Sequence, residues 1–543
     1  MIDAYFSAQE GYLSRPIDYD GISYMLTARA PYLMLHSLHL RTALHELAAS
    51  ISPLWISVLT IQQLILGEGT WQAFSVRFWG VALLLVLVYW IVSRRANRAL
   101  AIVAVVLTAL LPVVSAGVRA SSWEYFSGYA SYFETWYLDD LRPDFFAIVL
   151  VLWSAAALAE HGAAPRRSAY VISAVFAAAA VLVKSSTAPV ALVAWAAVLG
   201  ITWVVNRRDR NVTRLTLFAV ILLAVLLLPW AVFAHGASTV VTYLKQITAF
   251  QGAYASGGGI AGGFTYFLIR IPNQLGQVES LAVIVGVVVV TIALLRGRLT
   301  TAELVYAVLA PLFYVVYSLP PSKNPQLGMW VSLSIWIYLL AGVARLTAVR
   351  WPDRIHRVAR VALPAVAAYT LVVYGLGAFA LAAWPPNEHR SNEQLLTITS
   401  GVADELGRHL SAGECFAYVP GPGWPSTLIY RVGDETGNIP TNTAIDVDPT
   451  TTTISDYVAS ASKCPAVLAY REDISTVAQA FFAPSVRQPY LQAVAQWVRD
   501  PANGYALART WQFSDLAPGA PHELGHYQGV SLTLDLYVRT AAP

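Results

Sequence analysis

Apolar runs long enough to cross a lipid bilayer fill most of the first 384 residues of this 543-residue chain. A helix needs about 20 apolar residues to cross a hydrocarbon core of ~30 Å, and stretches such as VALLLVLVYWIV meet this with their flanks. Composition agrees, because 57% of the residues are hydrophobic and 12% are charged. The sequence therefore predicts a polytopic α-helical membrane protein with about ten spans, at 72–93, 99–117, 143–160, 169–184, 187–205, 213–234, 278–295, 302–318, 327–344 and 361–384.

Clusters of arginine between these runs predict the orientation. They occupy every second loop, whereas the alternate loops hold few basic residues, so the positive-inside rule places the clusters in the cytoplasm. The preference for arginine over lysine and the heavy use of alanine suggest a GC-rich bacterial genome, so the membrane is expected to be a bacterial plasma membrane. The loops at about 118–142, 235–277 and 319–326, and all residues after Trp384, are then outside. The clusters are Arg94, Arg95 and Arg98; Arg166 and Arg167; Arg207, Arg208, Arg210 and Arg214; Arg296 and Arg298; and Arg345, Arg350, Arg354, Arg357 and Arg360.

The stretch at 48–66 precedes the first full span and allows two interpretations. We favour a helix on the outer membrane surface, because the stretch is short and contains Pro53 and two glutamines. If it crossed the membrane instead, the first 45 residues would be cytoplasmic, and the arginine pattern does not distinguish the two. The first 45 residues contain no signal peptide or span that would deliver them outside. We therefore expect either an upstream helix missing from this reading frame or a first span that translocates its N-terminus.

The character of the chain changes after Trp384-Pro385-Pro386. Short strand-like stretches, CFAYV and PAVLAY, alternate with helix-like ones, and VSLTLDLYVR alternates as a half-exposed strand does. We predict a soluble extracytoplasmic α/β domain at 385–543, after an extracytoplasmic first loop with surface helices at 1–71 and a transmembrane bundle at 72–384. The two cysteines, Cys415 and Cys464, both lie in the C-terminal domain and are compatible with one extracytoplasmic disulfide.

Charged residues on the predicted outer side are candidates for chemistry, since ions near lipid are costly to bury. The acids are Asp18 and Asp20 in RPIDYDGISY and Asp139, Asp140 and Asp144 in YLDDLRPDFFAIVLV; the cations are Lys184, Lys245, Arg270 and Lys323. Helix capping also accounts for an Asp before or in a first helical turn. Charge alone favours general contact between the cations and lipid headgroups over a specific phosphate clamp.

Acids and cations on one face of a many-helix bundle suggest a transfer reaction. A carboxylate can take a proton from an acceptor hydroxyl while cations stabilise a phosphate leaving group. Neither ATP nor a nucleotide sugar is available outside the cell, so the activated donor is expected to be a lipid-linked phosphosugar.

Several short motifs resemble the GT-C glycosyltransferases, in the branch of protein O-mannosyltransferases and lipid A aminoarabinose transferases. These are the outer Asp of the first loop, the Pro-bearing helix SPLWISVLTIQQLILGEG, Arg77 entering a span, Arg142-Pro143-Asp144 opening a span, and Lys184 closing the next, over roughly residues 15–345. The resemblance implies a GT-C-like bundle with a C-terminal soluble domain and an inverting reaction without a covalent intermediate. It makes Asp20 the general base and Asp144, or its neighbours Asp139 and Asp140, the second acid. Lys184, Arg270 and Lys323 become candidates for binding polyprenyl phosphate.

The resemblance also implies the partners of the chain. They are a polyprenyl-phosphate sugar donor, a hydroxyl acceptor on cell-envelope glycan, lipid or protein, and membrane lipid. No cofactor is required. A divalent metal stays an open alternative without support, because Gly21 stands where many relatives have a second acid. A net charge of +3 does not suggest nucleic-acid binding. The alternative function is a multi-span transporter or flippase, against which stands the absence of paired interrupted spans in the sequence. A binding protein anchored by its spans is a third, and ten spans exceed what an anchor needs.

Two other motifs resemble known sites without completing them. His522, Glu523 and His526 in PHELGHYQGVS have the spacing of zinc peptidases, but Leu532 stands where a third ligand is needed and no later Glu replaces it. The glycine-rich SGGGIAGG, ending at Gly263, lacks the Lys-Ser/Thr signature of a phosphate-binding loop. We predict that it forms a mobile loop over the substrate cavity.

Overall fold

The computed structural model is described here over most of the chain, in eighteen segments. These are residues 19–67, 72–73, 75–114, 143–161, 166–234, 236–238, 240–241, 259–297, 300–320, 327–348, 368–373, 375–376, 387–411, 414–418, 441–442, 453–471, 484–513 and 532–540. The chain divides into two compact units, one at 27–380 and the other at 381–543 together with 1–26. The boundaries predicted at 71 and 384 stay predictions.

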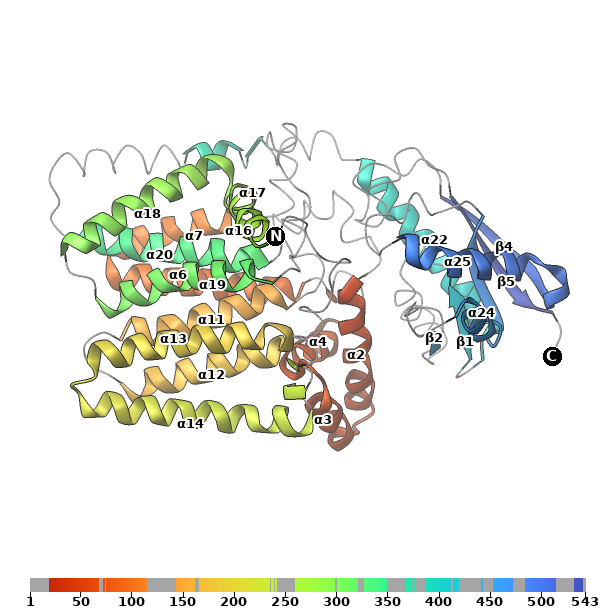
Figure 1. Cartoon of the computed structure of the whole chain (residues 1–543), viewed down its shortest axis with the longest axis horizontal. Coiled ribbons are helices and arrows are strands. Elements are labelled where there is room, and N and C mark those ends of the chain that lie inside the picture. The colour runs from red at the N-terminus through yellow and green to blue at the C-terminus, as the bar shows by residue number, and fades with distance from the viewer. Residues whose placement is uncertain are drawn as a thin grey trace. The chain divides into compact units, whose positions relative to one another are not determined.

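The larger unit is a bundle of long helices (Figure 1). Six of the described helices are long and apolar enough to cross a membrane: α6 (Arg77–Arg95), α13 (Ala188–Asn206, with the preceding turn), α14 (Arg210–Phe233), α18 (Gln277–Gly297), α19 (Thr301–Ser318) and α20 (Gly328–Ala348). The apolar helices α7 (Arg98–Ala109), α11 (Asp144–Ala159) and α12 (Arg167–Val183) are shorter. The count of about ten spans therefore stays a prediction, and the run predicted at 361–384 is described only in part.

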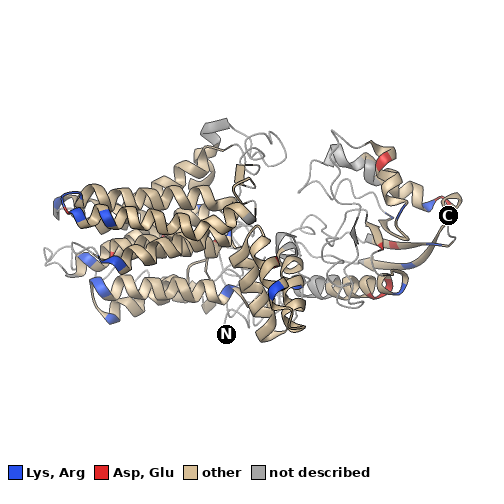
Figure 2. Ribbon diagram, turned by 90° about the horizontal axis from the view of Figure 1, so that it is seen from below, with Lys and Arg blue, Asp and Glu red and all other residues tan. Residues whose placement is uncertain are grey.

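Arginines gather at one end of this bundle (Figure 2). They lie where α6, α13, α18 and α20 end and where α7, α12 and α14 begin, which fits the alternation seen in the sequence. We call this the arginine end, and the other the Asp144 end, because α11 begins there. Helices that alternate in direction are what connected spans produce, so residues far apart in sequence meet at each end.

Helix α11 is the central element of the bundle. Every residue from Asp144 to Ala159 is buried except Trp153, which is half-buried. It packs against α12 and α13 on one side and against α6, α19 and α20 on the other, as its position in Figure 1 shows. A helix that is apolar all round, as DFFAIVLVLWSAAALA is after its first residue, is expected in such a place.

Three helices precede the bundle: α2 (Tyr19–His36), α3 (Leu40–Ala49) and α4 (Pro53–Leu66). The stretch predicted as a surface helix is α4, which begins with Pro53 at a position where proline is favoured. It ends at Gly67, whose φ of 84° is in a region that favours glycine. Its 14 residues span about 21 Å, less than a hydrocarbon core. A surface location agrees with this length and stays a prediction.

The glycine-rich segment differs from its prediction. Instead of a loop, the described part of it opens helix α16 (Gly259–Leu268), which is followed by the short helix α17 (Ile271–Leu275). The segment continues into FTYFL, and these apolar residues extend the helix and outweigh the low helix propensity of glycine.

The second unit contains a five-stranded mixed sheet of order β2-β1-β3-β5-β4. Strand β1 lies parallel to β2 and β3, and β5 lies antiparallel between β3 and β4. The predicted strands CFAYV, PAVLAY and VSLTLDLYVR contain β1, β3 and β5. The elements are α22 (Asn387–His409), β1 (Cys415–Tyr418), β2 (Thr441–Asn442), α24 (Ile454–Ala461), β3 (Ala466–Tyr470), α25 (Pro484–Arg499), β4 (Tyr505–Phe513) and β5 (Leu532–Arg539).

The expectation that VSLTLDLYVR is half-exposed was wrong. Strand β5 is an inner strand, and Asp535 at its centre is as buried as the neighbouring Leu534 and Leu536. The alternation misled because the acid is neutralised inside the fold. Arg471 donates from Nε to Asp535 Oδ2 at 2.6 Å, and Thr510 donates to Oδ1 at 2.6 Å.

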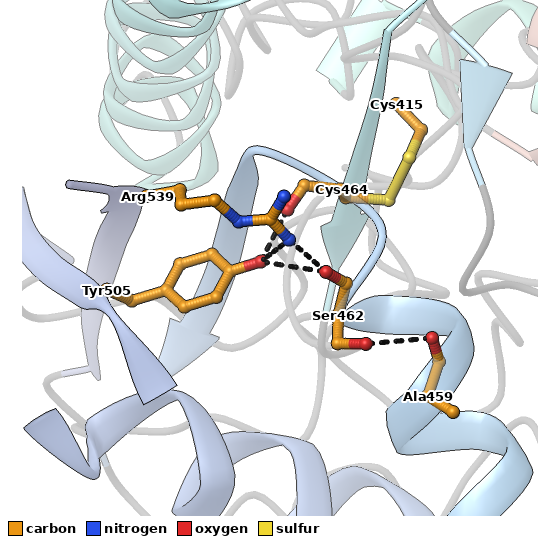
Figure 3. Close-up of a disulfide and its surroundings, with 6 residues drawn as sticks. All are labelled: Cys415, Ala459, Ser462, Cys464, Tyr505 and Arg539. Atoms are coloured by element: carbon orange, nitrogen blue, oxygen red, sulfur yellow. Dashed lines mark hydrogen bonds between the residues drawn. A yellow bond between two sulfur atoms is a disulfide. The ribbon is translucent and has the colours of Figure 1, made fainter. Parts of the chain in front are cut away.

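A disulfide joins Cys415 at the start of β1 to Cys464 just before β3, with 5.0 Å between the two Cα atoms (Figure 3). The Tyr505 hydroxyl donates to the carbonyl of Cys464 at 2.5 Å, and Arg539 donates to that hydroxyl at 2.9 Å and to the carbonyl of Ser462. The disulfide therefore lies beside a hydrogen-bonded turn that holds the strands in register.

Candidate functional site

Two of the residues selected from the sequence form an ion pair at the Asp144 end. Lys184 Nζ lies 2.5 Å from Asp144 Oδ2, and the two side chains are 10% and 1% exposed, respectively. Charged groups this deeply buried occur almost only when they are paired. The pair joins α11 to the end of α12, 40 residues further along the chain.

The local sequence explains why both side chains stand at helix ends. Pro143 precedes α11 and accepts from the Ala147 N–H at 2.9 Å, so Asp144 occupies the first helical turn, where the helix dipole favours a negative charge. Lys184 is the residue at which α12 stops, with an extended backbone, before the short turn Ser185–Thr187. Its carbonyl accepts from the Thr187 hydroxyl at 3.1 Å, which fixes that turn.

One oxygen of the pair is left open. Asp144 Oδ1 is buried and accepts no hydrogen bond from any residue within the described ranges. Most buried polar atoms have a partner, so Oδ1 is one of a minority of buried atoms in this structure at which a ligand group or water can complete the bonding. A carboxylate held by a lysine, with one oxygen available, is suited to accept a hydrogen bond from a hydroxyl.

The start of α4 lies against the same region. The Ile51 carbonyl accepts from the hydroxyl of Ser185, next to Lys184, and from the Trp230 indole N–H at 3.0 Å. The Trp55 ring packs 4.9 Å from that of Phe146, between ring centroids. Trp55 is 1% exposed and its indole N–H finds no partner in the described chain. The sequence reasoning did not select Trp55, because an apolar helix gives no sign of which aromatic residue packs against Phe146.

Arg270, another predicted phosphate ligand, is held at the same end of the bundle on a different corner. It precedes α17, and its guanidinium carbon lies 3.6 Å from the centroid of the Tyr266 ring, in a cation–π contact. Its NH1 also donates to the Tyr266 carbonyl at 2.9 Å. Among the described residues it makes no hydrogen bond or ion pair with Asp144 or Lys184.

The other candidate residues lie wholly or partly outside the residues that the structure describes. Asp20 is in helix α2 by its backbone, and its side chain is outside the described residues. Asp139, Asp140, Lys245 and Lys323 lie outside them, as does the PHELGH stretch. Within the described part of the chain, no group of three or more His, Cys, Asp or Glu side chains could hold a metal ion.

Comparisons with known proteins identify the fold. The chain matches no protein-family model and no curated protein. It is similar to the solved structures of ArnT, the aminoarabinose transferase, from Cupriavidus metallidurans, both apo and bound to undecaprenyl phosphate. Each has a TM-score of 0.55 at 14% identity and covers 88% of this chain. The match covers 94% of the apo ArnT chain and 93% of the ArnT chain bound to undecaprenyl phosphate. A weaker likeness, to the Archaeoglobus fulgidus oligosaccharyltransferase (TM-score 0.47, 13% identity, 94% of this chain, 72% of that one), carries no argument.

The chain therefore has the fold of ArnT, which agrees with the resemblance drawn from the sequence motifs. At this level of identity the likeness shows the fold alone. The described helices also agree with a membrane protein, since six of them have the length and composition of spans.

Proposed function

We propose that the chain is a membrane glycosyltransferase that moves a sugar from a polyprenyl-phosphate-linked donor to an acceptor hydroxyl. The observation that carries this is the buried Asp144–Lys184 pair, with one open carboxylate oxygen, at the start of the central helix of a GT-C fold. The structure of ArnT with undecaprenyl phosphate supports a donor of this class.

The chemistry follows from the charges. An acceptor oxygen attacks the anomeric carbon, the bond from that carbon to the phosphate oxygen breaks, and polyprenyl phosphate leaves with the electron pair. Lys184 supplies positive charge where negative charge develops on the phosphate. Asp144 holds the ammonium in place and offers Oδ1 to a sugar or acceptor hydroxyl. Asp20, assigned by the family resemblance, takes the acceptor proton as general base. Attack from the face opposite the phosphate inverts the anomeric centre.

The orientation proposed for the chain places the Asp144 end outside the cytoplasm. The arginine end is then cytoplasmic by the positive-inside rule. The disulfide between Cys415 and Cys464 supports an oxidising compartment for the C-terminal unit, because cytosolic thiols are kept reduced. In this arrangement both the active end and the C-terminal unit face the cell envelope, where the acceptor is a glycan, lipid or protein hydroxyl. No observation favours the transporter alternative.

A transfer assay tests the proposal. The purified chain is reconstituted with polyprenyl-phosphate arabinose, mannose or galactose, each radiolabelled, and with cell-envelope fractions. We expect label to move from at least one donor into glycan, lipid or protein. Asp20→Asn should lower the rate by about 10²–10⁴-fold, the range for losing a general base, while the neighbouring Asp18→Asn retains it. Unaltered transfer by Asp20→Asn would remove Asp20 as the base, and no transfer from any polyprenyl-phosphate sugar would contradict the proposed donor class.

A further inference from the structure

Four charged residues meet at the arginine end, each from the end of a different helix. Arg95 closes α6, Glu160 follows the last residue of α11, Glu303 lies in the first turn of α19, and Arg345 lies in the last turn of α20. Arg95 Nε donates to Glu160 Oε1 and Oε2 at 2.8 and 3.0 Å. Arg95 NH1 donates to Glu303 Oε1 at 3.0 Å, and Arg345 NH1 pairs with Glu303 Oε2. We call these four residues the four-helix network.

The network is buried and its acids are fully bonded. The side chains of Glu160 and Glu303 are 5% and 3% exposed, and that of Arg95 is 10% exposed. The Tyr306 hydroxyl adds a bond to Glu160 Oε1 at 2.9 Å, and the Thr300 N–H adds one to Glu303 Oε2 at 2.7 Å. Every carboxylate oxygen in the network thus accepts at least one hydrogen bond. Such complete bonding gives a fixed geometry rather than a site open to a ligand.

Glu160 lies at a helix end that is unfavourable for its charge. It caps the C-terminal end of α11, where the helix dipole disfavours a negative charge, whereas Arg95, Glu303 and Arg345 each stand at an end that suits their charge. A residue that opposes its local preference is usually retained for another constraint. Here the constraint is the fork of Arg95, which reaches Glu160 and Glu303 at once.

Helix α11 connects this network directly to the candidate site. Its 16 residues span about 24 Å, with Asp144 at one end and Glu160 just past the other. Along its length, Trp153 donates to the Leu83 carbonyl at 3.0 Å and Ser154 to the Ser173 carbonyl at 2.7 Å. Protein interiors are close-packed and scarcely compressible, so a shift or rotation at one end of such a helix moves the other end as well.

We propose that Glu160 and Arg95 are positioning residues for the transfer reaction. They fix the axial position and rotation of α11 and thereby hold Asp144 where its carboxylate meets Lys184. This inference rests on the proposed function for its effect on catalysis, whereas the placement of Asp144 is measurable without it. An error of about 1 Å in a reacting group costs on the order of 100-fold in rate, so a small displacement of α11 is sufficient for a large effect.

The first arm of the test measures placement. The only cysteines of the chain are joined in a disulfide, so a pair introduced by Asp144→Cys and Lys184→Cys can be joined selectively by a short bifunctional thiol reagent. We expect Glu160→Gln and Arg95→Lys, each added to this pair, to lower the cross-linking rate several-fold. The matched control is Arg94→Lys, a neighbouring exposed arginine on the same helix, which should leave the rate unchanged.

The second arm measures transfer in the otherwise wild-type chain. Glu160→Gln and Arg95→Lys should lower kcat by about 10–100-fold while KM for the donor changes less than about twofold, and Arg94→Lys should match the wild type. Because Glu160 acts through Asp144, adding Glu160→Gln to Asp144→Asn should cause no further loss of kcat. Arg95→Lys keeps both arms decisive if Glu160→Gln does not fold.

The outcomes separate the two proposals. Unchanged cross-linking in folded Glu160→Gln and Arg95→Lys overturns the positioning role, even if kcat falls, because the loss would then be general to the fold. Fully additive losses in the double variant overturn it as well. Reduced cross-linking together with normal transfer by Asp144→Asn would support the positioning of α11 and contradict the catalytic role of Asp144.

Discussion

A buried carboxylate paired with a cation lies at each end of α11, but the two ends differ in whether every carboxylate oxygen accepts a hydrogen bond. At the arginine end, both oxygens of Glu160 and both of Glu303 accept hydrogen bonds. At the Asp144 end, Lys184 occupies one oxygen and the other is buried without a partner among the described residues. A complete network fixes a structure, whereas an incomplete one can accept a further hydrogen bond. The comparison predicts that substitutions at the first end reduce stability most and that those at the second reduce transfer most.

The largest effect on stability is expected for Glu303→Leu. This change leaves the buried Arg95 and the partly exposed Arg345 without their shared carboxylate and removes the capping box of α19. Breaking a buried ion pair on one side costs about 3–5 kcal/mol, so the folded yield and the melting temperature in detergent should fall sharply. Glu46→Leu, at an exposed position on α3, serves as the control. Equal melting temperatures for the two variants would show that the network does not stabilise the bundle.

Substitution of Lys184 alone, or of Lys184 and Asp144 together, distinguishes the effect of their ion pair on stability from its effect on transfer. Lys184→Met alone leaves Asp144 buried and unpaired and should cost about 2–3 kcal/mol, as for other buried polar groups that lose a partner. Lys184→Met combined with Asp144→Leu removes both charges and should restore most of the melting temperature. Both variants should be inactive in transfer. If the double variant is no more stable than the single one, the pair does not behave as an isolated buried ion pair.

Asp535 extends the comparison to the C-terminal unit. Both of its carboxylate oxygens accept hydrogen bonds, from Arg471 and Thr510. Asp535 therefore resembles the fully bonded carboxylates of the arginine end. Asp535→Asn should destabilise the C-terminal unit by about 1–2 kcal/mol, because Arg471 is half-exposed and water replaces part of the lost bonding. Transfer per folded molecule should stay within about twofold. A tenfold loss of transfer without unfolding would place Asp535 among the residues that act on the acceptor.

The smallest effect concerns Glu405 on α22, whose pKa is lowered below its usual value, first by the hydrogen bond from Arg509 and then by those from His409 and Arg408. A carboxyl with a lowered pKa in the folded state stabilises the fold above its unfolded pKa of about 4.3, and this stabilisation is lost as the pH falls through the folded pKa. Solvent screening keeps the effect below about 1 kcal/mol. Glu405→Gln should therefore melt slightly lower than wild type at pH 7, and the difference should be smaller at pH 3. A constant difference at both pH values would exclude this carboxylate as its source.

The sequence alone predicted which residues stand at span ends, and the structure determined what they face. Asp144 and Lys184 were selected separately as charges at helix ends, and their pairing is visible only in the fold because 40 residues separate them. Arg95 and Arg345 were interpreted as cytoplasmic loop cations by the positive-inside rule. Both also pair with a carboxylate of another helix, Arg95 with Glu160 and Arg345 with Glu303, which the loop pattern does not predict.

Predictions from the local sequence pattern were wrong in two places: where a charge was neutralised inside the fold, and where a run of glycines continued into apolar residues. The alternating VSLTLDLYVR predicted one exposed face, and the pairing of Asp535 with Arg471 buried it instead. The glycines before Phe264 predicted a loop, and the following apolar residues carried the helix back to Gly259. In both cases residues outside the motif determined the structure that the motif adopts. The resemblance drawn from short motifs agrees with the fold that the chain shares with ArnT, because those motifs mark helix ends, which the sequence pattern does locate.

The most direct test of the account is the turnover number of folded Asp144→Asn with a polyprenyl-phosphate sugar, measured beside its melting temperature. We predict that turnover falls by about 10²–10³-fold, because Lys184 loses the carboxylate that holds it where charge develops on the phosphate, while the variant still folds with a melting temperature no lower than that of Lys184→Met. Wild-type turnover by a folded Asp144→Asn would contradict the claim that this incomplete ion pair is the site of transfer.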